Sequence, residues 1–305
     1  MRQGHPNDWS GKSRGGVAGY LVFVFFIRKL GLRAAYVLLA FVALYFIPFS
    51  PSTTRAVWFY SRKILGKSRL SSVIFLYTNY FNLGVALIDK TAASSGLYDN
   101  FTFQFDEPRD VSDILAGNSG ALIIGAHFGN WEVGAPYFGK YGKKMNVVMI
   151  DAEYRNIKSL LEKQNKLSAF SVIPVSEDSI DHVFMIKDAI SRGEYVAMQG
   201  DRLTQKGKSY ESHFMGRRAS FPLGPFVLAS RTEAPVIFYF AIREGFKRYK
   251  FVFRLFRPEE SVRRRGGEVN VLNAYIKELE SAVRTAPEQW NNFYKFWLCL
   301  RRKKY

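Results

Sequence analysis

The sequence contains few of the residues and motifs on which several common enzyme classes depend. Cys299 is the only cysteine among 305 residues, so no intrachain disulfide can form, which fits a reducing compartment. The four histidines (His5, His127, His182 and His213) show no metal-ligand spacing. The chain has no phosphate-binding P-loop, no dinucleotide-binding glycine pattern and no Gly-x-Ser-x-Gly nucleophile motif. We therefore expect chemistry without a metal or another cofactor.

Acidic residues are also scarce. There are 26 of them against 44 lysines and arginines, which gives a formal net charge of +18. Such a charge implies an anionic partner, namely nucleic acid, an anionic lipid or an acidic carrier protein. The basic residues lie among apolar, aromatic stretches, and no nucleic-acid recognition module is apparent. These features favour an anionic membrane surface over nucleic acid.

No apolar run reaches the roughly 20 residues that a membrane-spanning helix needs. Residues 17–27 and 34–47 are apolar, but Arg28, Lys29 and Arg33 separate them, and no signal-peptide cleavage site is evident. We expect two membrane-associated helices that lie in or dip into the interface. Two alternatives remain: a buried helical hairpin of a soluble domain, or a single span over residues 34–49.

The rest of the chain has the pattern of one α/β domain. We expect a disordered basic tail over residues 1–16, membrane-associated helices over 17–50 and a single domain over 51–305. Strands alternate with helices from residue 101 onward, which predicts a mainly parallel sheet flanked by helices. The last two strands are expected to form an antiparallel hairpin at one edge. The expected strands are 101–105, 121–126, 146–150, 171–175, 195–199, 236–241 and 249–256, and the expected helices are 55–65, 70–88, 131–138, 155–165, 179–191, 223–230 and 268–284.

The most informative segment follows the strand predicted over residues 121–126. His127 comes directly after it, and Glu132 follows five residues later. A turn relaxed by Gly129, with Asn130 as a helix cap, could fold the glutamate back onto the imidazole. A carboxylate on one ring nitrogen fixes the tautomer and frees the other nitrogen to take a proton from an attacking hydroxyl or amine. The alternative is a histidine that merely packs at the end of a strand.

The hexapeptide His-Phe-Gly-Asn-Trp-Glu over residues 127–132 resembles the His-x4-Asp/Glu signature of glycerolipid and lysophospholipid acyltransferases. It is more similar to the form found in the lipid A late acyltransferases, the lauroyl and myristoyl transferases. Residues 286–297 resemble that family's C-terminal Pro-Glu-Gln-aromatic motif. Their form is closest to a divergent branch encoded beside aryl polyene and similar lipid pathways. The resemblance covers about residues 17–300.

This resemblance implies a glycerolipid acyltransferase-like fold and an acyltransferase on the cytoplasmic face of a bacterial inner membrane. The acyl donor would be a thioester of acyl carrier protein, and the acceptor a hydroxyl or amine of a lipid. His127 would act as the general base with Glu132 as its partner. No covalent acyl-enzyme, metal or nucleotide would be needed.

The resemblance also selects candidates for substrate binding. Arg155 lies in a stretch similar to the family's Tyr-Arg-x-x-x-Asn, but residues 165–170 lack the Gly-Arg pair that usually follows. Asp201 and Arg202 end a hydrophobic strand, where they could support the site or form a structural ion pair. Gly216 and Arg217 belong to a Phe-x-Gly-Arg-x-Ala block that could bind an anion or oxyanion. Asn130 completes the set of expected substrate-binding residues.

Two other functions stay open from the sequence. The first is transfer of an aminoacyl or other carrier-bound acyl group to a lipid, which the missing Gly-Arg pair leaves possible. The second is a non-catalytic peripheral membrane protein that keeps the fold, against which the intact His127 and Glu132 argue.

Overall fold

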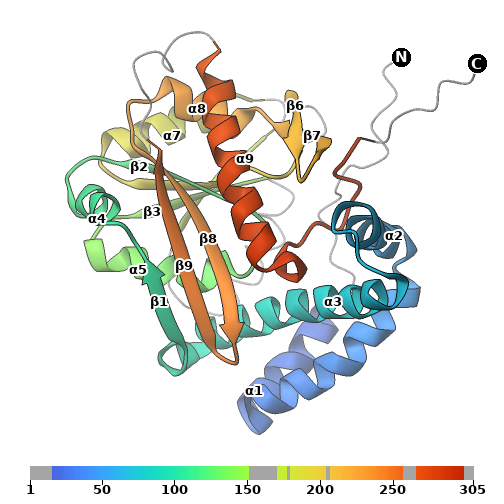
Figure 1. Cartoon of the computed structure of the whole chain (residues 1–305). Coiled ribbons are helices and arrows are strands. Elements are labelled where there is room, and N and C mark those ends of the chain that lie inside the picture. The colour runs from blue at the N-terminus through green and yellow to red at the C-terminus, as the bar shows by residue number, and fades with distance from the viewer. Residues whose placement is uncertain (1–15, 151–169, 177–178, 204–206, 257–265, 299–305) are drawn as a thin grey trace, which may run out of the picture.

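The computed structural model describes residues 16–150, 170–176, 179–203, 207–256 and 266–298. Its centre is a seven-stranded sheet with the strand order β1-β9-β8-β2-β5-β3-β4 (Figure 1). Strands β8, β2, β5, β3 and β4 run parallel, β9 pairs antiparallel with β8, and β1 pairs parallel with β9 at the edge. The strands are β1 (Thr102–Asp106), β2 (Ala121–Gly125), β3 (Met145–Ile150), β4 (Ser171–Val175), β5 (Tyr195–Gln199), β8 (Val236–Gly245) and β9 (Arg248–Phe256). The predicted α/β class and mainly parallel sheet are confirmed.

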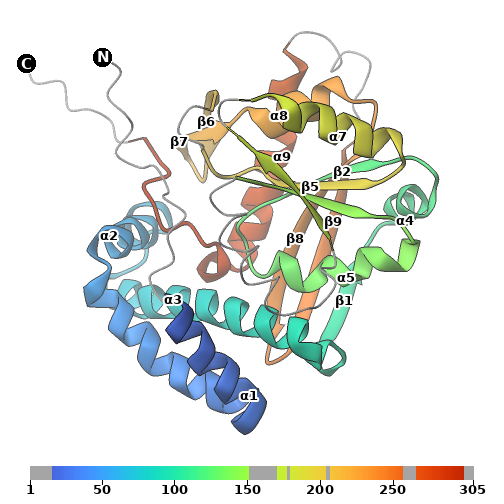
Figure 2. The same cartoon turned by 180° about the vertical axis from the view of Figure 1, so that it is seen from behind.

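Successive side chains of a strand point to opposite faces of the sheet, so the strands contribute to two hydrophobic cores, one on each face. In β2, Leu122 and Ile124 enter one core, whereas Ala121 and Ile123 enter the other. The first core is covered by α7 (Asp181–Ser191), α8 (Gly224–Arg231) and α9 (Gly267–Thr285). The second is covered by α4 (Arg109–Ala116) and by the segment η4 (Trp131–Gly134), α5 (Ala135–Phe138) and η5 (Gly139–Tyr141) (Figure 2). All five residues of β2 are buried, as expected for a central strand.

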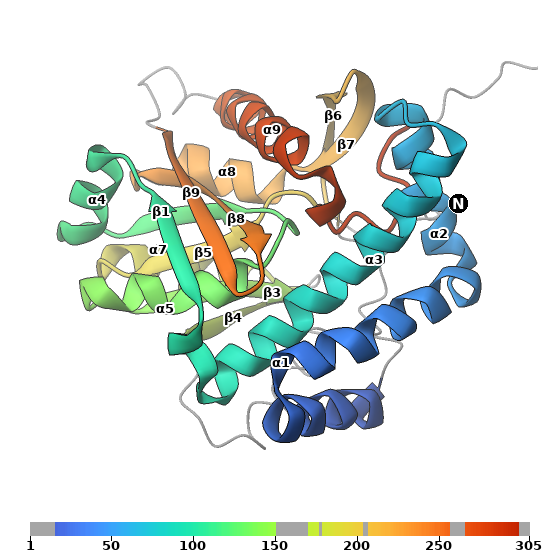
Figure 3. The same ribbon diagram turned by 60° about the horizontal axis from the view of Figure 1, so that its bottom comes forward.

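Helix α3 (Arg69–Ala92) contributes to both cores. Phe75, Leu76 and Tyr80 in its first half pack into the first core, and Val85 and Ile88 pack into the second. Figure 1 shows α3 running below the sheet, past the turn of the β8–β9 hairpin, and Figure 3 shows α1 on the far side of α3. The short helical elements around α3 are α2 (Pro51–Phe59), η1 (Tyr60–Ile64), η2 (Ala93–Leu97), η3 (Tyr98–Asn100) and, near the end of the chain, η7 (Pro287–Gln289).

Helix α1 (Gly16–Phe49) is broken in the middle, because Gly31 has φ 82° and ψ 171°. The sequence predicted this separation into two apolar helices. Among the described residues, two stretches could cross a membrane by length and composition alone, namely Leu21–Phe49 and Arg69–Asn100. A buried carboxylate ties α1 to the sheet: Asp89 of α3 accepts hydrogen bonds from Tyr36 of α1 and from Tyr249 of β9. Burial raises the pKa of Asp89 above its ordinary value.

One pair of strands was not predicted. Strands β6 (Ser209–Phe214) and β7 (Arg217–Pro222) form a separate antiparallel hairpin. Four of the six residues of β6 are exposed, so the apolar–polar alternation that marks a half-buried strand is missing from its sequence. The predicted hairpin of the last two strands is confirmed, but β1 and not β9 forms the edge of the sheet.

Candidate active site

The pairing of β2 with β5 brings His127 and Asp201 together. These parallel strands are neighbours, with Gly125 opposite Gln199 at their carboxyl ends. His127 and Asp201 each lie two residues beyond that pair. Ligand and catalytic sites of parallel α/β sheets form at this end of the strands. The register of the sheet therefore positions a carboxylate beside the imidazole.

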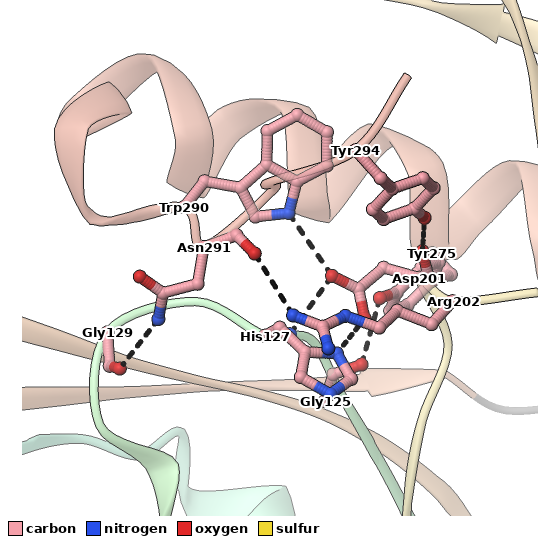
Figure 4. Close-up of polar contacts among 9 residues, drawn as sticks. All are labelled: Gly125, His127, Gly129, Asp201, Arg202, Tyr275, Trp290, Asn291 and Tyr294. Atoms are coloured by element: carbon pink, nitrogen blue, oxygen red, sulfur yellow. Dashed lines mark hydrogen bonds and ion pairs between the residues drawn. The ribbon is translucent and has the colours of Figure 1, made fainter. Parts of the chain in front are cut away.

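Three N–H groups converge on the Asp201 carboxylate (Figure 4). Its Oδ1 lies 2.7 Å from Nδ1 of His127, and its Oδ2 accepts the backbone N–H of His127 at 3.0 Å. The indole N–H of Trp290 donates to Oδ2 at 3.2 Å. An ionised carboxylate only accepts hydrogen bonds, so Nδ1 of His127 must carry its proton. The lone pair of the neutral ring is then on Nε2, where a general base needs it.

Burial and charge agree with this assignment. The side chain of Asp201 is 3% exposed, whereas that of His127 is 23% exposed, so the imidazole remains accessible from one side. Burial by itself would raise the pKa of the Asp201 carboxyl group. The charge and hydrogen bonds of His127, together with the charge of Arg202, hold that pKa below its ordinary value. Asp201 is therefore an anion that can orient His127 and stabilise its protonated form.

The C-terminal segment 286–298 closes around this pair. The backbone N–H of Asn291 donates to the carbonyl of His127 at 2.8 Å, and that of Gly129 donates to the carbonyl of Gln289 at 2.9 Å. The hydroxyl of Tyr294 donates to the carbonyl of Asp201 at 2.8 Å. Both residues of the pair are thus held by a segment that lies about 90 or more positions away in the sequence.

Gly129 permits a close approach of two chains in the loop after His127. Its φ of +59° lies in the left-handed region, as the predicted turn requires. A Cβ atom at this position would lie 1.6 Å from the carbonyl oxygen of Ala241 in β8. Any larger residue would have to move the loop away from the sheet.

Glu132 does not lie where the sequence predicted. The structure pairs its carboxylate with the ammonium group of Lys90 on α3. The expected contact with the imidazole is not among the interactions of the described residues, and Asp201 occupies Nδ1 instead. The short 3-10 helix η4 begins directly after Asn130 and carries Glu132, whose carboxylate reaches α3 at Lys90. We therefore correct the predicted partner of His127 from Glu132 to Asp201.

Of the remaining predicted site residues, Asn130 and Arg202 lie close in the chain to His127 and Asp201. Asn130 precedes η4 but makes no side-chain cap, and its Nδ2 donates to the carbonyl of Ala86 on α3 at 2.9 Å. Arg202 lies beside the pair and donates from Nη2 to the carbonyl of Asn291 at 3.0 Å. Arg155 lies outside the described residues.

Gly216 and Arg217 belong to the β6–β7 hairpin and have other partners. Gly216 has φ +78° in the turn, and the neighbouring backbone N–H of Met215 donates to Glu280 of α9 at 2.9 Å. The guanidinium of Arg217 lies 5.8 Å from the ring centroid of Phe59 on α2. Within the described part of the chain, no contact joins either residue to His127.

Sequence reasoning placed Asp201 near the site but did not assign it to the imidazole. It singled out the motif that contains Trp290 without giving that residue a role in the site, and it did not consider Tyr275. Tyr275 of α9 donates to the carbonyl of Gly125 at 2.8 Å and so fixes the end of β2 from the helical layer. The sequence did show that His127 and Asp201 each come just after an apolar strand. That observation brings the two residues together only when the two strands are known to be neighbours in the sheet.

Comparison with known families identifies one family for this chain. The chain matches a model of the bacterial lipid A biosynthesis acyltransferases over residues 87–299, which is well over half of its length. The matched region begins within α3 and contains His127, Asp201 and the segment that closes around them. A search of curated proteins gives no match.

Proposed function

We propose a specific reaction for this chain, which belongs to the bacterial lipid A biosynthesis acyltransferase family and is therefore an acyltransferase. The proposed reaction moves a fatty acyl group from the thioester of an acyl carrier protein to a hydroxyl or amine of a lipid. The His127–Asp201 pair carries the proposal, because it combines a buried, ionised carboxylate with a partly exposed imidazole.

In this mechanism Nε2 of His127 takes the proton of the acceptor as the acceptor attacks the thioester carbonyl. A new C–O or C–N bond forms, and the carbonyl oxygen becomes an oxyanion. When the tetrahedral intermediate collapses, the C–S bond breaks and the imidazolium returns its proton to the leaving thiolate. Asp201 keeps the ring in the productive tautomer and stabilises the imidazolium through Nδ1.

Arg202 is the proposed source of positive charge beside the reacting carbonyl. It lies next to the pair, and its charge already lowers the pKa of Asp201. A fixed guanidinium near a developing oxyanion stabilises the transition state more than the ground state. Asn130 remains a proposed binding residue because the loop that carries it continues directly from His127.

The proposed location is the cytoplasmic face of a bacterial inner membrane, with anionic lipid as the surface partner. Two features support association with a membrane. Large apolar side chains are exposed along α1, and the net charge of +18 favours an anionic surface. An acidic carrier protein would be attracted by the same charge.

The reaction can be tested with purified protein, acyl carrier protein loaded with a fatty acid, and a lipid A precursor as acceptor. Mass spectrometry should show a product heavier by one acyl group and free carrier thiol in equal amount. His127→Ala should abolish both products because the base is lost. Turnover near the wild-type rate in His127→Ala would falsify the mechanism.

A further inference from the structure

The broken helix α1 shows how the protein would meet a membrane. Its halves, residues 16–30 and 32–49, are separated by the non-helical Gly31 and double back on each other (Figure 3). At 1.5 Å per residue these halves are only about 22 Å and about 27 Å long. The hydrocarbon core of a bilayer is about 30 Å thick. The break therefore divides a stretch that would cross a membrane if it were continuous.

The second half lies against the catalytic domain along its length. Leu32, Ala35, Leu39 and Ala43 recur at helical spacing and are buried. Leu39 packs directly onto Gly84 of α3, where a Cβ would lie 2.2 Å from a Leu39 methyl group. Since side chains of α3 enter both cores of the domain, this half of α1 runs along the surface of the domain and does not project from it.

The opposite side of the same half is apolar and exposed. Val37, Phe41, Leu44 and Tyr45 are 62%, 67%, 55% and 57% exposed, and they too follow helical spacing. Soluble proteins rarely leave such a face in water. Exposed large apolar side chains continue onto the first half of α1 and the first turns of α3, at Leu21, Val22, Phe25, Leu70, Val73 and Ile74.

Three cations surround the break. Arg28, Lys29 and Arg33 are all exposed and lie within three residues of Gly31. Carrying a cation to the middle of a bilayer costs about 2.5–3.5 kcal/mol on insertion scales. At the level of anionic headgroups each cation instead gains about 1 kcal/mol.

The break is also fixed to the catalytic domain. Phe246, in the turn between β8 and β9, lies with its ring centroid 5.5 Å from the guanidinium of Arg33. The Tyr36 ring packs edge-on against the same phenylalanine at 5.5 Å. Because these contacts hold the break in α1 on the surface of the domain, the break cannot reach the far side of a bilayer.

We propose that α1 is a monotopic anchor: a broken helix that lies in one leaflet, apolar face inward and cations at the headgroups, and never crosses the membrane. The occupant of the exposed face is an anionic lipid surface. This inference rests on the proposed membrane association and adds that residues on both sides of α1 share one side of the bilayer with the catalytic domain.

Labelling of single cysteines tests this topology. In a Cys299→Ser background, cysteines replace Ser13, Leu30 or Ser52, and Lys187→Cys on exposed α7 marks the side of the catalytic domain. Sealed membrane vesicles of each orientation are treated with a membrane-impermeant maleimide. We expect Ser13→Cys, Leu30→Cys and Ser52→Cys all to react from the side on which Lys187→Cys reacts.

The other outcomes overturn the proposal in distinguishable ways. Labelling of Ser13→Cys and Ser52→Cys from opposite sides means a single span, and labelling of Leu30→Cys alone from the far side means a hairpin that crosses twice. Either result leaves the proposed enzyme intact. A chain that does not sediment with vesicles containing anionic lipid would instead remove the membrane association itself, and the anchor with it.

Discussion

At the scale of single residues, the carboxylate of Asp201 holds His127 by two hydrogen bonds, one to the ring and one to the backbone. Asp201→Asn keeps the size of the side chain but removes the negative charge that fixes the tautomer. We expect kcat to fall by about 10²–10⁴-fold, with a much smaller change in KM, since ring orientation affects the transition state most. Initial rates with saturating acceptor measure this effect.

Glu132→Gln is the matched control, because it removes a carboxylate from the same loop without touching the ring. Its carboxylate pairs with Lys90, so we expect a loss of about 10-fold or less. Lys90→Met should give a similar loss, and the double variant should lose no more than either single variant, because all three break one ion pair. A larger loss in Glu132→Gln than in Asp201→Asn would return the orienting role to Glu132.

The same carboxylate makes stability depend on pH. The pKa of Asp201 is lower in the folded chain than its ordinary value, which is about 3.9 in an unfolded chain. Such a group stabilises the folded state above the unfolded pKa, and this contribution is lost as the pH falls through the folded pKa. The difference in free energy of unfolding between wild type and Asp201→Asn should therefore be full above about pH 5 and shrink in acid.

Urea denaturation of detergent-solubilised protein at a series of pH values measures that difference. Asp188→Asn serves as the control, because Asp188 is an exposed carboxylate, with its side chain 67% in contact with solvent. A gap between wild type and Asp201→Asn that grows as the pH falls contradicts an ionised, stabilising Asp201.

At the scale of elements, the segment 286–298 should decide whether the site forms. Trp290 is 1% exposed and packs against Tyr60, Phe214 and Phe296 while its N–H reaches Asp201. We expect deletion of residues 286–305 to reduce activity to background and to lower the melting temperature. Deletion of residues 299–305, which lie outside the described part of the chain, is the control and should leave both nearly unchanged.

Trp290→Phe separates packing from hydrogen bonding in that segment. The aromatic ring remains, but a buried carboxylate loses one of its three donors. A loss of about 1–3 kcal/mol in the free energy of unfolding is expected, together with a lower kcat. A variant as stable and as active as wild type would show that the indole N–H is dispensable.

Local sequence pattern was enough to predict most of the elements but not their pairing. Six strands and the three main covering helices lie within a few residues of their predicted bounds, because each has strong apolar periodicity. Strand β8 continues to Gly245, beyond its predicted end at residue 241. The exposed hairpin of β6 and β7 lacks such periodicity and was missed.

The candidate site was predicted only in part, for the same reason. His127 was recognisable from its motif, and Gly129 from the turn it had to make. The contact between His127 and Asp201 spans 74 positions and depends on β2 lying beside β5, which no local pattern encodes. Glu132, five residues after His127, was the carboxylate that the local sequence pattern suggested.

At the scale of the whole molecule, the charge of +18 should govern encounter with the acyl donor. Charge steering raises association rates by about 10–10³-fold, and it weakens as salt shortens the Debye length from about 10 Å at 0.1 M to about 3 Å at 1 M. Below saturation, transfer from an acidic acyl carrier protein should therefore fall steeply with added salt.

A small, weakly charged acyl thioester is the matched control donor, and its rate should fall much less over the same salt range. Detergent and acceptor are held constant in both series of initial rates. Equal salt dependence for the two donors would remove the electrostatic argument for a carrier protein and leave the proposed donor without support from charge.

Because the site depends on segment 286–298, it can form only late in the synthesis of the chain. Helix α1 is synthesised before the sheet, so the proposed anchor can meet a membrane while the sheet is still incomplete. The groups that bind the carbonyls of His127 and Asp201 emerge only after the whole sheet has been made. If α1 is a membrane anchor, a chain terminated before residue 286 would still reach the lipid surface but would lack a finished site. The proposed anchor is thus made before the site, and only a chain that includes segment 286–298 has the contacts that complete the site.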